Sequence, residues 1–397
     1  MDWLCANGPA DVAVIRFNGG AQAAHNVVAS DGRHHTFSQF GSGTLHPGVR
    51  TYLSRFVVVD PIAMAMEAEH LDALGVPATW ERLTVDEHAL LATPWHRAAN
   101  RLRESRRGPQ RHGSCGVGVG EVMAFSLAYP DEAPGVGDVL DPARLGRKLA
   151  AVRDALTDEL GDLGYEPSVA AVSDSFQAFG TAVSIVDGSQ VARLLRTGRC
   201  VFEGAQGVLL DEWRGWHPFT TWSTTTFDNA ETLLAEAGQA GDALRLGVVR
   251  AYTTRHGPGP MVTEDATLTA ELPDAYNTDG RWQGAFRVGH FDAVAHAYAI
   301  EVCGGVDGLA VTHLDVAERR DDLRICQSYA VGGTVLERLV PGDFGDLAYQ
   351  EKLTSLLLDA EPLYGEAVTA DAIGAALGTP VLLESRGPTA RDKRARA

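Results

Sequence analysis

Residues 201–226 restrict what this chain can fold into more than any other segment. The segment opens with β-branched and aromatic residues, which is typical of a buried strand. The strand pattern stops at Gly204 and Gly207, where a backbone without Cβ atoms can approach a ligand closely. Gln206 stands between these glycines, and its amide both donates and accepts hydrogen bonds. Residues 220–226 carry six hydroxyl side chains in seven positions, enough donors to surround a phosphate. The segment therefore predicts a strand that ends in a ligand-binding loop.

Length and composition limit the class of protein. At 397 residues, with 45% hydrophobic and 22% charged residues, the chain is typical of a globular protein with ample core material. No internal repeat or low-complexity linker interrupts it, so we expect a single domain over residues 1–397, including a short basic tail at 385–397. The formal net charge of −18 argues against general affinity for nucleic acid or anionic membranes, which requires clustered Lys and Arg.

The cysteines and apolar stretches bear on location. Five cysteines lie far apart, without a CxxC motif or the spacing of a zinc site, which fits a reducing compartment. No stretch approaches the roughly 18 apolar residues that a membrane span requires. The N-terminus also lacks the basic-then-apolar pattern of a signal peptide. We therefore expect a soluble, cytoplasmic protein.

Alternating strand and helix patterns indicate an α/β fold. A helix is expected over residues 142–160, because Asp141 can cap it, proline occupies its first turn and apolar residues recur at helical spacing. Four apolar runs predict strands that open into polar or glycine-containing loops: 11–17, 56–59, 246–252 and 308–312. An α/β sheet of this kind binds ligands at the carboxyl ends of its strands.

Several runs together resemble one known family. Residues 203–207 read Glu-Gly-Ala-Gln-Gly, and residues 217–226 read His-Pro-Phe-Thr-Thr-Trp-Ser-Thr-Thr-Thr. Both resemble the IMP-pocket motifs of the adenylosuccinate synthetase family. Residues 251–260 resemble a further family loop, although a rigid Gly/Pro turn after a strand would explain them equally well. The resemblance covers nearly the whole chain and implies a P-loop-NTPase-like, mostly parallel sheet flanked by helices, with insertions.

A single histidine follows the strand expected at 11–17. Taken alone, residues 16–28 are better explained by a surface turn in which His25 is a capping or solvated residue. The run resembles the family's Gly-Gly-His-Asn-Ala-Gly-His-Thr-Val-Val, whose second histidine is the general acid and falls on His25. Histidine suits that role because its unperturbed pKa is near 6.5. The family's nucleotide-contacting asparagine falls on Gln22, and the resemblance implies that Gln206 orients the purine.

A second glycine-rich run lies at residues 113–120. It could cradle a phosphate through its backbone N–H groups or form a loop without a ligand. It resembles the family's clamp for the IMP phosphate, with Ser114 and Cys115 in place of two threonines and Val117 in place of an arginine. Because a thiol is a weak donor, the resemblance implies weaker or altered phosphate binding. Thr221 is implied to hold the same phosphate.

The loop at residues 277–292 resembles the aspartate-binding loop of the family. Aligned from its left end it keeps Thr278 and Arg281, and aligned from its right end it keeps Arg287, so the loop carries an insertion. Two arginines stand where the family has three. Guanidinium groups bind dicarboxylates through paired hydrogen bonds. The resemblance therefore implies aspartate as the amine substrate. The altered loop leaves a different amine as an open alternative.

Two segments resemble the guanine pocket of the family. In the first, Asp315 matches the aspartate that reads guanine, and His313 replaces a lysine whose stem lies along the base. A lone aspartate at a strand end is more often a cap or a turn former. In the second, Ser385, Gly387 and Pro388 match the family's Ser-X-Gly-Pro wall. With both walls present in the family order, guanine binding is the favoured interpretation.

The family opens with a strand and a Gly-Asp-Glu-Gly-Lys-Gly-Lys loop, and this sequence contains no such loop. The family's first strand is therefore apparently missing, together with the general base and the first lysine. A shortened record and a true loss of the segment both explain this. Because a first strand is usually central, its removal is expected to expose two unpaired strand edges.

The resemblance implies a GTP-dependent ligase that phosphorylates the 6-oxygen of IMP and displaces it with aspartate. GTP as substrate, Mg²⁺ as cofactor and a homodimer are implied in the same way, and no metal ligand is identified in the sequence. Two alternatives remain open at this point. The chain could be a catalytically degenerate purine-nucleotide-binding relative, or an enzyme for a different purine monophosphate or amine.

Overall fold

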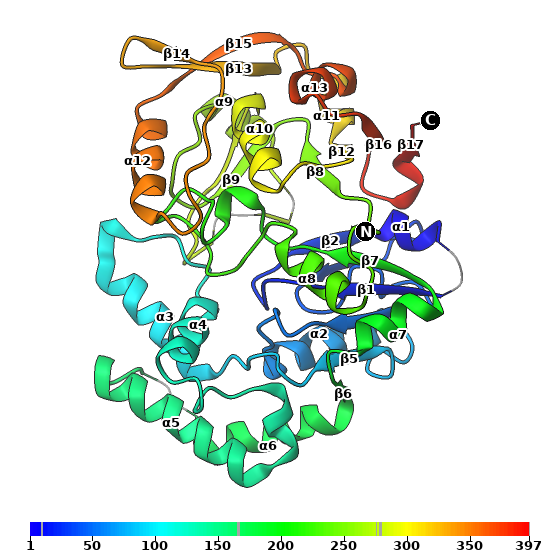
Figure 1. Cartoon of the computed structure of the whole chain (residues 1–397), viewed down its shortest axis with the longest axis vertical. Coiled ribbons are helices and arrows are strands. Elements are labelled where there is room, and N and C mark those ends of the chain that lie inside the picture. Colours follow the sequence, from blue (N-terminus) through cyan, green and yellow to red (C-terminus); the bar gives the residue numbers. More distant parts are fainter. Residues whose placement is uncertain (9–10, 165–166, 275, 278–279, 397) are drawn as a thin grey trace. The chain divides into compact units, whose positions relative to one another are not determined.

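The structure is a computed structural model that describes residues 1–8, 11–164, 167–274, 276–277 and 280–396 (Figure 1). The chain forms two compact units. The first contains residues 1–206, 222–225 and 229–241, and the second contains residues 207–221, 226–228 and 242–397. The chain passes between the two units several times. The expectation of a single domain over residues 1–397 stays a prediction.

A five-stranded parallel sheet forms the centre of the first unit. Its order is β6–β5–β4–β1–β7, and all neighbouring strands run parallel. The strands are β1 (Val12–Arg16), β4 (Arg50–Leu53), β5 (Leu83–Asp86), β6 (Ser184–Val186) and β7 (Arg199–Glu203). An antiparallel hairpin, β2 (His25–Val28) and β3 (His34–Phe37), follows β1.

Helices cover both faces of this sheet. They are α1 (Asp2–Ala6), α2 (Pro61–Ala73), α3 (Pro94–Arg107), η1 (Gly108–Gln110), α4 (Val119–Ala128), η2 (Val136–Leu140), α5 (Pro142–Leu160), α6 (Val169–Ala182), α7 (Gln190–Thr197) and α8 (Asp228–Glu236). Successive strand side chains point to opposite faces. Tyr52 accordingly packs in a cluster with α7 and α8, whereas its neighbour Leu53 belongs to the cluster that contains α2, α5 and α6. Figure 1 shows α5 and α6 side by side.

The expected helix over residues 142–160 is confirmed as α5, with the same bounds. The Asp141 carboxylate accepts the Arg144 N–H at 3.0 Å, which caps the first turn. The predicted apolar positions are all buried: Leu145, Leu149, Val152, Leu156 and Leu160.

One expected strand is wrong. Residues 56–59 form a turn followed by isolated bridges, and the strand in this part of the sheet, β4, already ends at Leu53. Val57 and Val59 are buried nevertheless. A short run of apolar residues indicates that the segment is buried. It does not indicate a strand, because a loop packed under helices has the same run of apolar residues.

The second unit contains two further sheets and a hairpin. The first sheet has the order β17–β16–β12–β8, in which β8 (Leu246–Arg250), β12 (Gly308–Thr312) and β16 (Val381–Ser385) are parallel and β17 (Lys393–Ala395) is antiparallel. The second pairs β13 (Arg324–Val331) with β11 (Phe291–Asp292), β14 (Thr334–Leu336) and β15 (Glu361–Ala367). The hairpin pairs β9 (Thr253–His256) with β10 (Phe286–Gly289).

Helical elements complete the second unit: η3 (Val208–Leu210), α9 (Ala266–Glu271), α10 (Ala293–Val302), α11 (Leu314–Glu318), α12 (Leu347–Leu358), α13 (Ala370–Leu377) and η4 (Ala390–Asp392). The parallel strands flanked by helices confirm the expected α/β class. Among the described strands, β7 and β8 each lie at the end of a sheet, with a pairing partner on one side. In α/β sheets, ligands bind at the carboxyl ends of parallel strands. We therefore expect ligands at the carboxyl ends of the neighbouring strands β1 and β7 in the first unit, and of the neighbouring strands β12 and β16 in the second.

Candidate functional site

Two loops meet at the carboxyl edge of the first sheet, where β1 and β7 end. These strands are parallel neighbours in register, so the residues that follow them emerge together. Asn18 joins the two loops, because its amide donates to the Ala205 carbonyl at 3.2 Å and its oxygen accepts the Ala205 N–H at 2.8 Å. The Gly19 N–H donates to Ser223 Oγ at 3.1 Å. These buried bonds hold both loops in one arrangement.

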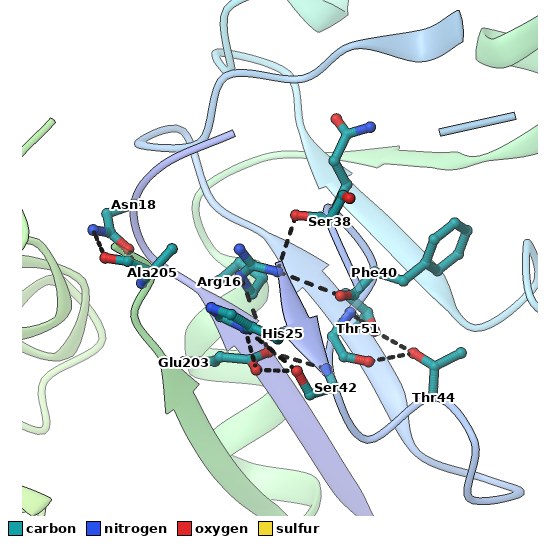
Figure 2. A network of polar contacts seen from close by, with 12 residues as sticks. Arg16, Asn18, His25, Ser38, Phe40, Ser42, Thr44, Thr51, Glu203 and Ala205 are labelled. Carbon is teal, nitrogen blue, oxygen red and sulfur yellow. Dashed lines mark hydrogen bonds and ion pairs between the residues drawn. The ribbon is translucent and has the colours of Figure 1, made fainter. Parts of the chain in front are cut away.

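His25, at the start of β2, reaches the end of β7 (Figure 2). Its Nδ1 lies 2.9 Å from Oε1 of Glu203. The Ser42 hydroxyl donates to the same Oε1, and the Ser42 N–H donates to Oε2 at 3.0 Å. Arg16 Nε lies 4.0 Å from Oε2. The Glu203 side chain is 2% exposed and that of His25 is 25% exposed, so the imidazole has a buried, anchored side and an accessible side.

The charge of Glu203 follows from its neighbours. Burial by itself would raise the pKa of this carboxyl, but His25, Arg16 and the Ser42 hydroxyl outweigh it and lower the pKa to about 2. The group is therefore ionised at neutral pH. An ionised carboxylate only accepts hydrogen bonds, which places the bridging hydrogen on Nδ1 of His25.

Two buried amides face the glycine turn after β1. The side-chain oxygen and nitrogen of both Gln22 and Gln206 are buried and make no hydrogen bond to any described residue. A Cβ on Gly19 would lie 2.9 Å from Gln206 Nε2, and one on Gly20 would lie 3.0 Å from Gln22 Oε1, so both amide ends lie close to the turn. The turn favours glycine because Gly19 has a φ of 79° and a Cβ on Gly20 would lie 2.7 Å from the Val58 carbonyl oxygen. Buried amides without partners are costly, and they are typical of positions that a ligand completes.

Gln206 also has an unusual backbone. Its φ is 65°, in the left-handed region that residues with a Cβ rarely adopt. Strain of this kind persists where the surrounding structure imposes it, often at ligand-binding positions. The sequence-predicted residues His25, Gln22 and Gln206 thus come together at one sheet edge.

Ser114 and Cys115 lie in the loop between η1 and α4. Ser114 Oγ donates to Asn100 Oδ1 at 2.8 Å and accepts the Gly116 N–H at 3.4 Å. Cys115 is half-buried, and the burial of its thiol raises its pKa. Arg101, an exposed residue of α3, donates from Nε to the Gly116 carbonyl at 3.0 Å. A guanidinium therefore reaches this loop even though Val117 occupies the position of the family's arginine.

Thr221 belongs to the second unit, where it is half-buried and its N–H donates to the Leu210 carbonyl at 2.8 Å. Ser223, two residues later, belongs to the first unit and is bonded to Gly19. The hydroxyl-rich run is thus divided between the two units.

The carboxyl edge of β12 and β16 carries the residues expected to read guanine. His313 and Asp315 follow β12, and Ser385 ends the neighbouring β16. His313 adopts a φ of 59°, and burial together with the charge of Arg250 lowers its pKa to about 4. Its ring is therefore neutral at pH 7.

The carboxylate of Asp315 pairs with Arg319 at 2.7 Å, one turn along α11. On the facing strand end, Ser385 Oγ donates to the Gly387 carbonyl at 3.2 Å. A Cβ on Gly387 would lie 2.8 Å from the Asp392 carboxylate, which explains the glycine at this position. Pro388 follows in the same bend and is exposed.

The two arginines expected to bind an amino acid lie in different elements, Arg281 on a turn and Arg287 on β10. Arg281 is exposed on a turn closed by reciprocal hydrogen bonds between Gly280 and Gly284 at 2.9 Å, and its guanidinium lies over the Trp282 ring at 5.1 Å. Thr278 lies outside the described residues.

Arg287, on β10, donates to the carbonyls of Gly257 and Gly259 at 2.7 and 2.8 Å and pairs with Glu264 at 2.5 Å. It therefore braces the Gly257–Gly259 turn, and its contact with a substrate stays a prediction.

The described residues contain no group of three or more His, Cys, Asp or Glu side chains that could hold a metal ion. Across the same residues, no helix is long and apolar enough to cross a membrane. The five cysteines are all free thiols.

Sequence reasoning missed three of the residues that build this site. Glu203 lies inside the Glu-Gly-Ala-Gln-Gly run, and its placement as the last residue of a strand was the available signal. The sequence contained no signal for Ser42 or Arg101. The contact of Ser42 with Glu203, and that of Arg101 with Gly116, depend on how separate segments of the chain meet.

Comparisons with known proteins agree with this geometry. Residues 1–357 match the family model described as adenylosuccinate synthetase. The adenylosuccinate synthetase of Anaeromyxobacter sp. (strain K) is 35% identical over 349 residues, which cover 84% of this chain and 78% of that protein.

Two solved structures share the fold at 20% sequence identity. The fully ligated adenylosuccinate synthetase from Plasmodium falciparum superposes with a TM-score of 0.84, covering 100% of this chain and 95% of that one. The succinoaminodeoxyadenylate synthetase of cyanophage S-2L, bound to dGMP and to dATP as an energy donor, superposes with a TM-score of 0.61, covering 99% and 89%.

Proposed function

Because the chain belongs to the adenylosuccinate synthetase family and is a GTP-dependent ligase of that family, we propose that it joins aspartate to IMP. The observation that carries this proposal is the pair of buried, unpartnered amides of Gln22 and Gln206 beside His25. A purine with adjacent donors and acceptors supplies the partners that these amides lack.

The proposed reaction has two steps. In the first, IMP loses its N1 proton to solvent, and its 6-oxygen attacks the γ-phosphorus of GTP. An O–P bond forms, the bond between the γ-phosphorus and the bridging oxygen breaks, and GDP leaves. In the second, the amine of aspartate attacks C6, a C–N bond forms, the C–O bond breaks, and inorganic phosphate leaves as the amine loses a proton.

His25 is the proposed catalytic acid. Its Nδ1 is committed to Glu203, so only Nε2 is free to face the transferred phosphoryl group. A protonated imidazole there donates a hydrogen bond to an oxygen on which charge develops, and it protonates the departing phosphate. Because the His25 side chain is 25% exposed, it can meet a ligand.

Other predicted residues take binding roles in the proposal. Gln206 and Gln22 orient the purine, and Ser114 holds its phosphate, assisted by the exposed guanidinium of Arg101. Thr221 is assigned to the same phosphate by resemblance. On the second unit, His313, Asp315, Ser385, Gly387 and Pro388 receive the guanine of GTP. Cys115 lines the phosphate loop, and Thr278, Arg281 and Arg287 are assigned to aspartate by resemblance.

Magnesium, oligomeric state and location complete the proposal. Mg²⁺ is usually held by one or two carboxylates together with substrate phosphates, so it is proposed to accompany GTP. A homodimer and a cytoplasmic location are proposed from the family resemblance and from the five free cysteines.

A different purine monophosphate or amine is the second candidate. It is favoured by the phosphate loop, where Cys115 and Val117 replace a hydroxyl and a guanidinium, and by the engagement of Arg287 with Gly257 and Gly259. The related enzyme bound to dGMP illustrates that a protein with this fold takes another purine monophosphate.

The test is phosphate release from GTP and Mg²⁺ by the purified 397-residue chain, with IMP and aspartate supplied together and singly. The proposal expects release only when both are present, with one succinyl-purine product formed per phosphate. Release that requires dGMP or another amine instead would favour the second candidate. No release with any combination would contradict both.

A further inference from the structure

Buried residues anchor one side of the His25 ring. The carboxylate of Glu203 receives three hydrogen bonds: from His25 Nδ1 and the Ser42 hydroxyl at Oε1, and from the Ser42 N–H at Oε2 (Figure 2). All three donors come from segments far from Glu203 in the sequence. The proposed function uses His25 but gives no role to this arrangement.

We propose that Glu203, held in place by Ser42, is a positioning residue that fixes the tautomer and the orientation of the His25 ring. This inference rests on the proposed function, in which His25 is the catalytic acid. Nδ1 keeps its hydrogen at all times because an ionised carboxylate accepts it. The exchangeable proton is thereby confined to Nε2, on the accessible side of the ring, where a phosphoryl group would bind.

The positions of the two carboxylate oxygens make this assignment specific. A backbone N–H cannot change role, so the Ser42 N–H always requires an acceptor at Oε2. Oε1 is the oxygen that faces the imidazole, 2.9 Å from Nδ1. The Ser42 hydroxyl also donates to Oε1 and lies 3.4 Å from Nδ1, so it limits rotation of both groups.

Arg16 keeps the carboxylate charged without competing for the ring. Its side chain is 1% exposed, its Nε lies 4.0 Å from Oε2, and its Nη1 donates to the carbonyls of Ser38 and Phe40 at 3.4 Å. The segment that carries Ser42 is therefore attached to the end of β1. Burial of the ion pair keeps solvent from screening it.

Glu67 provides a matched comparison in the same region. Its buried carboxylate also accepts backbone N–H groups of this segment, from Ser38 at 3.0 Å, Gln39 at 2.9 Å and Phe40 at 3.3 Å. The histidine beside this carboxylate is His35, whose Nε2 lies 3.6 Å from Oε1 of Glu67. Glu67→Gln therefore reproduces the structural disturbance of replacing a buried carboxylate by an amide, without altering the neighbour of the catalytic imidazole.

Glu203→Gln is the decisive variant. The amide oxygen of glutamine must serve the Ser42 N–H, which turns its NH₂ group toward Nδ1 of His25. Nδ1 then has to accept a hydrogen bond, and the neutral ring is driven to the Nε2–H tautomer. In catalytic triads, the equivalent amide substitution stabilises the wrong tautomer and lowers kcat by about 10⁴-fold.

The first measurement is NMR of the full chain labelled with ¹⁵N and ¹³C in histidine, without ligands, at pH 8.5. The His25 signals are assigned by their absence in His25→Gln. The expected result is the Nδ1–H tautomer for the wild type, Ser42→Ala and Glu67→Gln, and the Nε2–H tautomer for Glu203→Gln. An Nε2–H tautomer in the wild type, or no change in Glu203→Gln, would overturn the inference.

The second measurement separates kcat from KM with GTP, IMP and aspartate. Glu203→Gln is expected to lower kcat by about 10²- to 10⁴-fold, with KM values changed less than about threefold. Ser42→Ala, which keeps the carboxylate beside the ring, is expected to lower kcat less than about tenfold. An equal loss of kcat in Glu67→Gln would show that Glu203 acts through general stability, and would overturn the inference.

The two measurements distinguish failure of the inference from failure of the proposed function. If the wild type forms no product, the proposed function fails, and the tautomers still decide whether Glu203 positions His25. If the wild type turns over but the tautomer does not depend on Glu203, only the inference fails.

Discussion

The two sheet edges of this protein hold their polar residues in different ways. At the end of β1 and β7, the carboxylate of Glu203 is buried and bonded to three groups from distant segments. At the end of β12 and β16, Asp315 pairs with Arg319, whose side chain is 70% exposed. The first edge has a single geometry before any ligand arrives, which favours catalysis by a preorganised group. The second edge can rearrange at little cost, which suits the binding of a nucleotide base.

His25→Gln should produce the largest effect, because it removes the only acid that we assign to the first edge. We expect kcat to fall by about 10²- to 10⁴-fold, measured as phosphate release under saturating substrates. His34→Gln is the control, since His34 lies in the same hairpin and bonds to Asn26 at 3.1 Å. A fall in the control as large as in His25→Gln would attribute the loss to the hairpin and not to the acid.

Acid should destabilise the first edge through Glu203. Folding lowers the pKa of this carboxyl from 4.5 to about 2, so the unfolded chain binds more protons than the folded one between these values. The stability that Glu203 contributes is therefore complete above about pH 4.5 and is lost as the pH falls toward 2.

The shift corresponds to a contribution on the order of 3 kcal/mol. The measurement is the free energy of unfolding of the wild type and of Glu203→Gln from pH 6 to pH 3. The difference between them should shrink as the pH falls, and a difference that stays constant would contradict the assignment.

Asp315→Asn tests the second edge. If this carboxylate reads the guanine N–H groups, its loss should raise KM for GTP by about 10- to 100-fold, the value of a hydrogen bond to a charged group. The KM for ITP, which lacks the exocyclic amine, should change less. An equal change for both nucleotides would indicate that Asp315 does not contact the base.

Gln22→Met should separate stability from binding at the first edge. The substitution removes a buried amide that has no described partner, so the free energy of unfolding should stay equal or rise by about 1 kcal/mol. The KM for IMP should rise about tenfold, because a ligand hydrogen bond is lost. Thermal unfolding and steady-state kinetics measure the two quantities. A variant that loses stability and keeps its KM would mean that the amide serves the fold.

Arg319→Ala should have the smallest effect. Removing an exposed i,i+4 partner costs less than about 1 kcal/mol, and it frees Asp315 for a base. The KM for GTP should therefore fall by no more than about fivefold, with the melting temperature nearly unchanged. A rise in KM would show that Arg319 itself contributes to nucleotide binding. The ion pair at the second edge would then be part of a preformed site, as the Glu203 network is at the first.

Local patterns predicted much of the molecule. The helix at 142–160 followed from a cap, a proline and apolar spacing within one segment. The strand at 11–17 was found as β1 (Val12–Arg16) for a similar reason. The run at 56–59 failed because burial alone does not distinguish a strand from a loop packed against helices.

The sequence by itself determined the α/β class, the family, the placement of Gln206 beside Gly207, and that of Gln22 and His25 in the run that follows Gly19 and Gly20. These are properties of short segments, in which spacing and residue type express the local backbone directly. Only the tertiary structure decided that His25 meets Glu203, 178 positions away, and that Ser42 meets it from 161 positions away. Such contacts depend on which strands become neighbours, and strand order is set by the packing of the whole unit, which no local pattern records.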